Sequence, residues 1–218
     1  CHECGMEGHR ARDCPNKGRP GHVPPPGSRA AALLAANANS GNSRMIKAVL
    51  CAGLYPMVFK CEETGPAKPP RCTVYNPDVA KEEPIQIHPC SVLKDMSGFE
   101  TRWMCFHEKV QTTAVYVRDA TPVSPYALLL FGGNISVQHA AGTVGVGKWI
   151  QFSCSAKVAV LFKELRAKLD RLLMDKIEQP DTDIYGEGGQ QVVSAIVQLV
   201  STEKLEKPPL AAPSGGKG

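Results

Sequence analysis

The sequence predicts a mainly β fold with flanking helices, in which the strands form a small antiparallel barrel. Between residues 57 and 154, short segments rich in β-branched and aromatic residues follow one another. Turn sequences such as NPD, KEEP and GGN separate these segments, and no helical pattern comes between them. A long segment with helical periodicity begins near residue 156. These features indicate one barrel with helices before and after it.

A helix is expected directly in front of the first strand. Its apolar residues recur at helical spacing: Met45, Ile46, Val49, Leu50 and Leu54. Asn42 or Ser43 can cap the start of this helix, and Gly53 and Pro56 end it. We therefore assign residues 43–155 to one helix plus the barrel.

The predicted strands have the length and spacing of a small all-β domain. They cover residues 57–61, 71–75, 85–89, 102–107, 114–118, 126–131, 135–138 and 149–154. Short strands at such spacing are typical of a barrel or a sandwich. An OB-type barrel is favoured, because the strands are few and the chain then continues into a long helix.

Amphipathic helices are predicted after the barrel, within residues 156–204. The first has apolar residues at intervals of four and three: Val158, Phe162, Leu165, Leu169 and Leu172. Pro180 ends this helix, and a second helix is expected over residues 190–200. The Pro- and Gly-rich residues 205–218 are predicted to be disordered.

Residues 1–15 carry closely spaced cysteine and histidine. Cys1, Cys4, His9 and Cys14 have the spacing C-x2-C-x4-H-x4-C. Three thiolates and one imidazole fill all four positions around a tetrahedral Zn²⁺ ion, so the predicted site is structural rather than catalytic. The segment resembles the CCHC zinc knuckle, which implies binding of single-stranded RNA or DNA. The alternative is a cysteine/histidine cluster that binds no zinc.

The net charge of +4 and the pI of about 8.6 are compatible with a nucleic-acid partner. Residues 16–42 form a Pro/Gly-rich linker, either a basic tether that contacts phosphates or a solvated connection, with a helical turn near residues 30–36. The candidate nucleic-acid-binding residues are His2, Arg10, Arg12, Lys17, Arg19, Arg71, Arg102, Lys109 and Arg118. In the knuckle, His2 can stack on a base and Arg10 can reach a phosphate.

Aromatic side chains of the predicted strands have two possible roles. On an exposed strand face they can stack on bases, and in the interior they pack the core. Packing is the favoured interpretation for each of them: Trp103, Phe106, His107, Tyr116 and Tyr126.

The cysteine count and the hydropathy pattern predict an intracellular protein, in the nucleus, the cytoplasm or both. Nine cysteines are present, and the six outside the knuckle lie singly in apolar segments, which favours free thiols over disulfides. No secretory signal and no apolar run of membrane-spanning length occurs. Because the first residue is Cys1, we expect a fragment, a processed product or an incomplete gene sequence.

Four stretches resemble the C-terminal region of DEAH/RHA-type ATP-dependent RNA helicases, in particular their RNA helicase A-like branch. They are IKAVLCAGLYP (46–56), IHPCSV (87–92), VSPYALLLFGGNISV (123–137) and KELRAKLDRLLMDKIEQP (163–180). The resemblance extends over about residues 43–184. It implies an OB-fold that lies over the RNA channel of a helicase core and contacts the nucleic acid. A zinc knuckle at this place is not a standard part of that family.

The motifs that hydrolyse ATP in such helicases do not occur in this sequence. It has no Walker phosphate-binding loop, no DEAH box and no arginine-finger motif. The segment GVGKW at 145–149 lacks the spacing of a phosphate-binding loop. We therefore assign no catalytic residue and expect ATP to bind only to a helicase core outside this sequence.

Three functions are open at this point. The chain can be the nucleic-acid-binding portion of a helicase, in contact with single-stranded or structured RNA, or DNA, and with the core domains of the same parent protein. It can be a stand-alone single-strand-binding protein built from the same parts. It can also be a docking module that binds other proteins.

Overall fold

The computed structural model describes residues 7–14, 29–64, 69–94, 96, 98–181 and 188–205. The chain divides into two compact units, residues 1–43 and residues 44–218. In the first unit the structure describes a 3₁₀ turn, η1 (Ala11–Asp13), and a helix, α1 (Arg29–Ala36). The helical turn predicted near residues 30–36 is therefore confirmed as α1.

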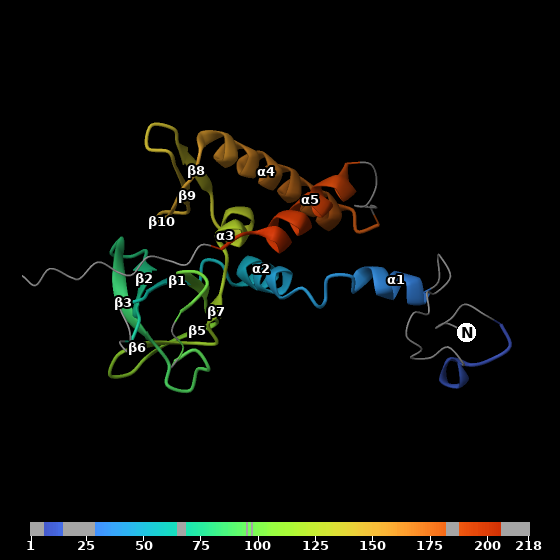
Figure 1. The fold of residues 1–218 in the computed structure, drawn as a ribbon, viewed down its shortest axis with the longest axis horizontal. Helices are drawn as coiled ribbons and strands as arrows, with labels where there is room; N and C mark the ends of the chain where they lie inside the picture. Colours follow the sequence, from blue (N-terminus) through green and yellow to red (C-terminus); the bar gives the residue numbers. More distant parts are fainter. Residues whose placement is uncertain are drawn as a thin grey trace, which may run out of the picture. The chain divides into compact units, whose positions relative to one another are not determined.

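The second unit begins with the helix that the sequence predicts. This helix is α2 (Ser43–Leu54), and its residues Ala48 and Cys51 are fully buried. A sheet of seven strands follows, shown as the green arrows in Figure 1. Its strands are β1 (Val58–Glu62), β2 (Arg71–Asn76), β3 (Lys81–Ile87), β4 (Trp103–Cys105), β5 (Glu108–Gln111), β6 (Val115–Arg118) and β7 (Thr121–Pro122).

The seven strands curl into a half-barrel of the OB type. Their order is β5-β6-β3-β2-β1-β4-β7. All neighbours pair antiparallel except β3 and β6, which run parallel and bring Gln86 opposite Tyr116 and Ile87 opposite Val117. The predicted strands near β1, β2, β4 and β6 are therefore confirmed, with small shifts at their ends. The segment KEEP, predicted as a turn, is wrong, because it is the first half of β3. Neither β5 nor the parallel pair was predicted.

Each face of the sheet belongs to a different apolar core. In β4, Met104 contributes to a core inside the half-barrel, together with Phe59 and Val117. Its neighbours Trp103 and Cys105 contribute to a second core, on the outer face. This alternation follows from the two-residue period of a strand, which sends successive side chains to opposite faces. The sheet thus separates the two apolar cores.

The outer core contains a helix where the sequence predicts a strand. Residues 126–131 belong to α3 (Pro125–Phe131), so the strand predicted there is wrong. Residues 127–130 are all buried, and a helix that is apolar on every side has no amphipathic period to reveal it. Ser124, which caps the helix through its side chain, and Pro125 at its first position are the local signal of a helix start.

After α3, a second sheet and two helices complete the outer core. The sheet has the order β10-β9-β8 and consists of β8 (Ile135–Gln138), β9 (Thr143–Val146) and β10 (Ile150–Ser153). The helices are α4 (Ala156–Glu178) and α5 (Gly189–Thr202), and both were predicted. In Figure 1, α4 and α5 lie side by side, with α3 between them and the half-barrel.

Polar contacts fix the helices of the outer core. Arg166 of α4 donates to the carbonyl oxygens of Gly132 and Gly133, the latter at 2.5 Å, and so occupies the C-terminal end of α3. A side chain at Gly132 would collide with the Leu128 carbonyl at 2.4 Å. Glu203, after α5, accepts a bond of 3.1 Å from the Tyr126 amide at the other end of α3.

In the part of the chain that the structure describes, no helix is long and apolar enough to cross a lipid bilayer.

Candidate nucleic-acid interface

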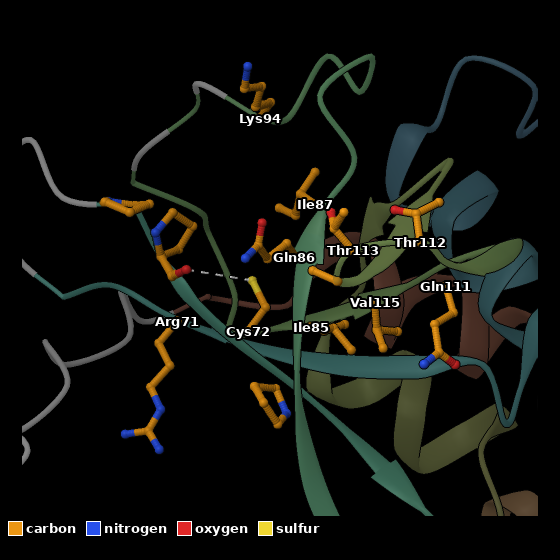
Figure 2. Close-up of a pocket in the computed structure, with 14 residues that line it drawn as sticks. Arg71, Cys72, Ile85, Gln86, Ile87, Lys94, Gln111, Thr112, Thr113 and Val115 are labelled. Atoms are coloured by element: carbon orange, nitrogen blue, oxygen red, sulfur yellow. Dashed lines mark hydrogen bonds between the residues drawn. The ribbon is translucent and has the colours of Figure 1, made fainter.

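The half-barrel opens at one end into a cleft of about 780 Å³. We call this cleft the mouth. Figure 2 shows the side chains that line it, which come from the start of β2, the end of β3 and the turn between β5 and β6. The lining residues are Pro69, Pro70, Arg71, Cys72, Pro84, Ile85, Gln86, Ile87, Lys94, Gln111, Thr112, Thr113, Ala114 and Val115.

Strand register determines which side chains form the floor of the mouth and which form its rim. Cys72 is paired with Ile85, and both belong to the inner core. The next residue on each strand, Thr73 or Gln86, points to the opposite face. The tight turn after Gln111 is closed by a 2.9 Å bond from the Thr112 amide to the Ala114 carbonyl. The floor is therefore apolar, and the rim carries amides, hydroxyls and cations.

The chemistry of the rim suits a polar, negatively charged ligand. Arg71 and Lys94 are exposed at the mouth, and the lining contains no acidic residue. Gln86 and Gln111 can each donate and accept hydrogen bonds, as the edges of nucleic-acid bases also do. The lining contains no aromatic residue, so bases cannot stack on aromatic rings inside the mouth.

Three side chains gather beside the mouth, where β3 and β6 end. The rings of His88 and Tyr116 meet edge to face with centroids 5.7 Å apart. Nδ1 of His88 accepts a 3.1 Å bond from the Cys90 amide, which places the proton of the neutral ring on Nε2. Nε2 lies 3.2 Å from Nη2 of Arg118. The Arg118 guanidinium has further N–H groups, which an oxygen acceptor beside this cluster can use.

The structure places the predicted cations of the barrel at separate positions. Arg71 lies on the rim of the mouth, whereas Arg102 is half-buried just before β4. Lys109 is exposed on β5, and Arg118 is exposed at the end of β6, 3.3 Å from Glu108. Of these four residues only Arg71 lines the mouth.

Sequence reasoning missed most of the rim. Lys94, Gln86 and the pair Thr112–Thr113 come from three separate segments, and strand pairing brings them together. The only local signal is a polar turn, QTT, between two strands. A search for clustered positive charge could not have found a rim with only two cations.

The aromatic residues serve mainly in packing. Trp103 and Phe106 are buried, and Trp103 meets Trp149 edge to face at 5.1 Å. Tyr126 packs on Phe162 with ring centroids 4.9 Å apart. The interpretation as core residues is therefore confirmed for Trp103 and Phe106. Tyr116 is half-buried and His107 is exposed.

Only part of the predicted zinc knuckle lies within the described residues. Cys14 is buried and His9 half-buried, with η1 between them. Gly8 has φ +95°, a conformation that favours glycine, as a tight ligand loop requires. Cys1, His2, Cys4, Lys17 and Arg19 lie outside these residues. Within them no three potential ligands come together, which leaves the four-ligand site a prediction.

The two knuckle arginines that the structure describes both face solvent. Arg10 is exposed. Arg12 is also exposed, and its Nε lies 3.3 Å from the Asp13 carboxylate.

The described cysteines have the chemistry of buried thiols. They form no disulfide with one another, and most of them are buried. Burial raises the pKa of Cys51 to about 12, with a smaller contribution from Cys105 nearby. Such thiols stay protonated at neutral pH and pack as small apolar groups.

Comparison with known proteins explains this combination of elements. Residues 46–135 match a family described as an oligonucleotide/oligosaccharide-binding (OB) fold, and residues 142–202 match the C-terminal domain in RNA helicases. The chain is a homologue of DExH-box helicases. The resemblance inferred from the sequence is thereby confirmed for the OB-fold and for the helicase type.

Three relatives illustrate the homology. The human ATP-dependent DNA/RNA helicase DHX36 is 40% identical over 177 residues, which are 79% of this chain and 17% of the relative. The Arabidopsis thaliana DExH-box ATP-dependent RNA helicase DExH1 is 42% identical over 169 residues, 77% of this chain and 16% of the relative. The mouse ATP-dependent RNA helicase DHX29 is 36% identical over 159 residues, 73% of this chain and 11% of the relative. The chain thus spans less than a fifth of each.

Proposed function

We propose that this chain is the nucleic-acid-binding portion of an ATP-dependent RNA helicase of the RNA helicase A-like branch. In this proposal the mouth of the OB-fold holds a single strand of RNA or DNA, and the parent protein supplies the ATP-hydrolysing core. The observation that carries the proposal is the mouth itself, an open cleft with two cations, several hydrogen-bonding side chains and no acid. The relatives are named as DNA/RNA or RNA helicases, which supports a nucleic acid as the ligand.

The shape of the mouth favours a single strand over a duplex. The edges of unpaired bases are free to bond to amides and hydroxyls such as those of Gln86 and Thr113, whereas in a duplex they are paired. The apolar floor, formed partly by Ile87 and Val115, can contact a ribose or a base face. A phosphate bound by Arg118, beside His88, would continue the strand beyond the mouth.

The zinc knuckle is the second contact in this proposal. The donor set of Cys1, Cys4, His9 and Cys14 suits Zn²⁺, and the ion would supply the folding free energy of a segment too short to have its own core. His2 and Arg10 would then contact a base and a phosphate. Arg12, Lys17 and Arg19 would add phosphate contacts along the same strand.

Fluorescence anisotropy with a labelled single-stranded RNA tests the two contacts separately. We compare the zinc-loaded chain with R71A/K94A, which removes both cations of the mouth, and with C4S/C14S, which removes two knuckle ligands. The control K81A/K157A removes two exposed cations outside the lining of the mouth and changes the net charge equally. The proposal predicts that R71A/K94A weakens binding well beyond the control. If R71A/K94A and the control K81A/K157A weakened binding equally, a specific role of the mouth would be contradicted.

A docking module is the second candidate function. Exposed apolar side chains on α2, Ile46, Val49 and Leu50, favour it, as do Leu161 and Ile177 on α4. In this alternative the other domains of the parent helicase cover these faces. An isolated chain that binds no RNA even at low salt, but binds the helicase core, would support docking over the first proposal.

A further inference from the structure

Two cysteines face each other across β1 and β2, inside the half-barrel. Cys61 and Cys72 are direct partners in the strand register. Their sulfur atoms are 3.2 Å apart. Both side chains are buried, at 3% and 4% exposure, among the apolar residues of the inner core.

The hydrogen-bond pattern places this pair at a position suited to a cross-strand bridge. The Cys61 amide donates a 2.7 Å bond to the Arg102 carbonyl, on the side of β4. Within a strand, the amide and the carbonyl of one residue point to the same side. Because the Cys61 amide points toward β4, its carbonyl does too, and neither group bonds to β2. Cys61 and Cys72 are therefore a non-hydrogen-bonded pair, the type in which the Cα atoms are closest, at about 4.5 Å. That separation lies within the range of disulfides.

Access distinguishes this pair from the other thiols of the core. Cys72 lines the mouth, and although it is only 4% exposed, a small opening of the rim would let an oxidant in the cleft reach its sulfur. Cys51 and Cys105 are fully buried in the outer core, and neither lines the mouth. Among the residues that the structure describes, Cys61 and Cys72 are the only two cysteines whose sulfur atoms are recorded in contact.

We propose that Cys61 and Cys72 are a redox modification site, converted to a reversible disulfide by hydrogen peroxide. The Cys72 sulfur attacks one peroxide oxygen: an S–O bond forms, the O–O bond breaks, and the leaving hydroxide takes the thiol proton as water. The Cys61 sulfur then attacks the sulfenic sulfur, an S–S bond forms, and a second water leaves with the Cys61 proton. Two thiols are oxidised by two electrons, and one peroxide is reduced to two waters.

The order of these steps follows from the surroundings of the two sulfurs. The contact with Cys72 and burial both raise the pKa of Cys61 far above its ordinary value, so Cys61 remains a thiol. Cys72 is the sulfur at the mouth, and it therefore reacts first. Its neighbour Arg71 is on the rim, so the bridge would fasten the start of β2, and Arg71 with it, to β1.

Peptide mapping under non-reducing conditions tests the proposal on the full chain. Trypsin cuts after Lys60, Arg71 and Lys81, which separates Cys61 and Cys72 into two peptides. After graded peroxide treatment and alkylation of the remaining thiols, we expect the two peptides joined, at their summed mass less two hydrogen atoms. Dithiothreitol should return both peptides as thiols. Circular dichroism before digestion verifies that the chain is still folded.

Two variants make the result specific. In C51S the joined peptides should form as in the wild type, because Cys51 belongs to the other core. In C61S they cannot form, and a sulfenic-acid reagent such as dimedone should label Cys72 instead. The proposal is overturned if the folded, oxidised wild type still yields Cys61 and Cys72 fully alkylated, or if either is linked mainly to another cysteine.

Discussion

The two faces of the seven-stranded sheet use the same kinds of residue for different purposes. On the outer face, Trp103 and the helices α2 to α5 enclose an apolar core, and Arg166 is bound to the carbonyl end of α3. At the mouth the inner core ends, and Arg71 is exposed on the rim, with its side chain directed away from the other labelled residues in Figure 2. One arginine, Arg166, is thus bound within the fold, whereas another, Arg71, is exposed at the mouth. Residue type alone does not separate structural from binding residues; burial and hydrogen-bond partners do.

The largest effect should follow from opening the outer core. Leu128 of α3 is fully buried, and L128A should lower the free energy of unfolding by about 2–5 kcal/mol because of lost contacts and a residual cavity. Urea unfolding followed by circular dichroism measures this change. The matched control is L173A on α4, a half-exposed position where the change should be within about 0.5 kcal/mol. Similar losses in both variants would contradict the described packing.

A smaller loss is expected from the arginine of the outer face. Replacing Arg166 with Met keeps much of its length but leaves the carbonyls of Gly132 and Gly133 without this charged donor. We expect a destabilisation of about 1.5–3 kcal/mol, the range for hydrogen bonds to charged groups. R171M, at an exposed position on the same helix, is the control for charge and helix propensity. An R166M chain as stable as R171M would show that the contact is dispensable.

The buried carboxyl after α5 should give stability a distinct pH dependence. Burial raises the pKa of Glu203, while bonds from Ser124 and Tyr126 and the nearby charge of Arg44 oppose this shift. The folded state therefore holds the Glu203 proton more tightly than the unfolded state. Its contribution to stability is complete below the ordinary value of 4.5 and falls as the pH rises through the raised folded pKa.

The variant E203Q tests that dependence. Glutamine keeps an oxygen that can accept from the Tyr126 amide but does not titrate. Across a pH series from 4.5 upward, the urea midpoint of E203Q should fall less than that of the wild type. Parallel curves for the two proteins would contradict the raised pKa.

The smallest effect on stability, and the clearest on binding, is expected at the mouth. R71A should change the free energy of unfolding by less than about 0.5 kcal/mol, because Arg71 is exposed on the rim. If Arg71 contacts a phosphate of a single strand, the slope of log affinity against log salt should decrease by about 0.7. Anisotropy titrations at several salt concentrations give this slope for the wild type and for R71A. A loss of affinity with an unchanged slope would point to a contact other than phosphate.

The same comparison explains how much of the structure the sequence could predict. The apolar residues of α2, α4 and α5 recur with a helical period that the sequence reveals. In α2 that period did not predict the buried side, because Ile46, Val49 and Leu50 are exposed and the small residues Ala48 and Cys51 are buried. Most strands up to Arg118 were recognisable by their β-branched and aromatic residues, whereas β5 and the first half of β3 consist mainly of charged and polar residues and were missed. The helix α3 was missed because every side of it is buried, which removes the period and leaves only the Ser124–Pro125 start signal.

The candidate site was much harder to predict than the fold. Arg71 was named from the sequence, but its partners Gln86, Lys94 and Thr113 are 15 or more residues away and are brought together by strand pairing. The parallel pairing of β3 with β6 is a long-range contact without a local signature. The knuckle differs from the mouth because its four ligands lie close together in the sequence and could be named from their spacing alone. The four-ligand site stays a prediction.

The contacts around α3 also have a consequence for exchanging the two matched regions of this chain. The two matched families meet between residues 135 and 142, yet Arg166 on one side bonds to Gly132 and Gly133 on the other. Arg44, ahead of the first family match, bonds to the carbonyl of Ser201 at the end of α5. A recombination breakpoint in that junction would cut through a shared interior. In this chain the two matched regions therefore share one interior, and exchanging only one of them would remove these contacts.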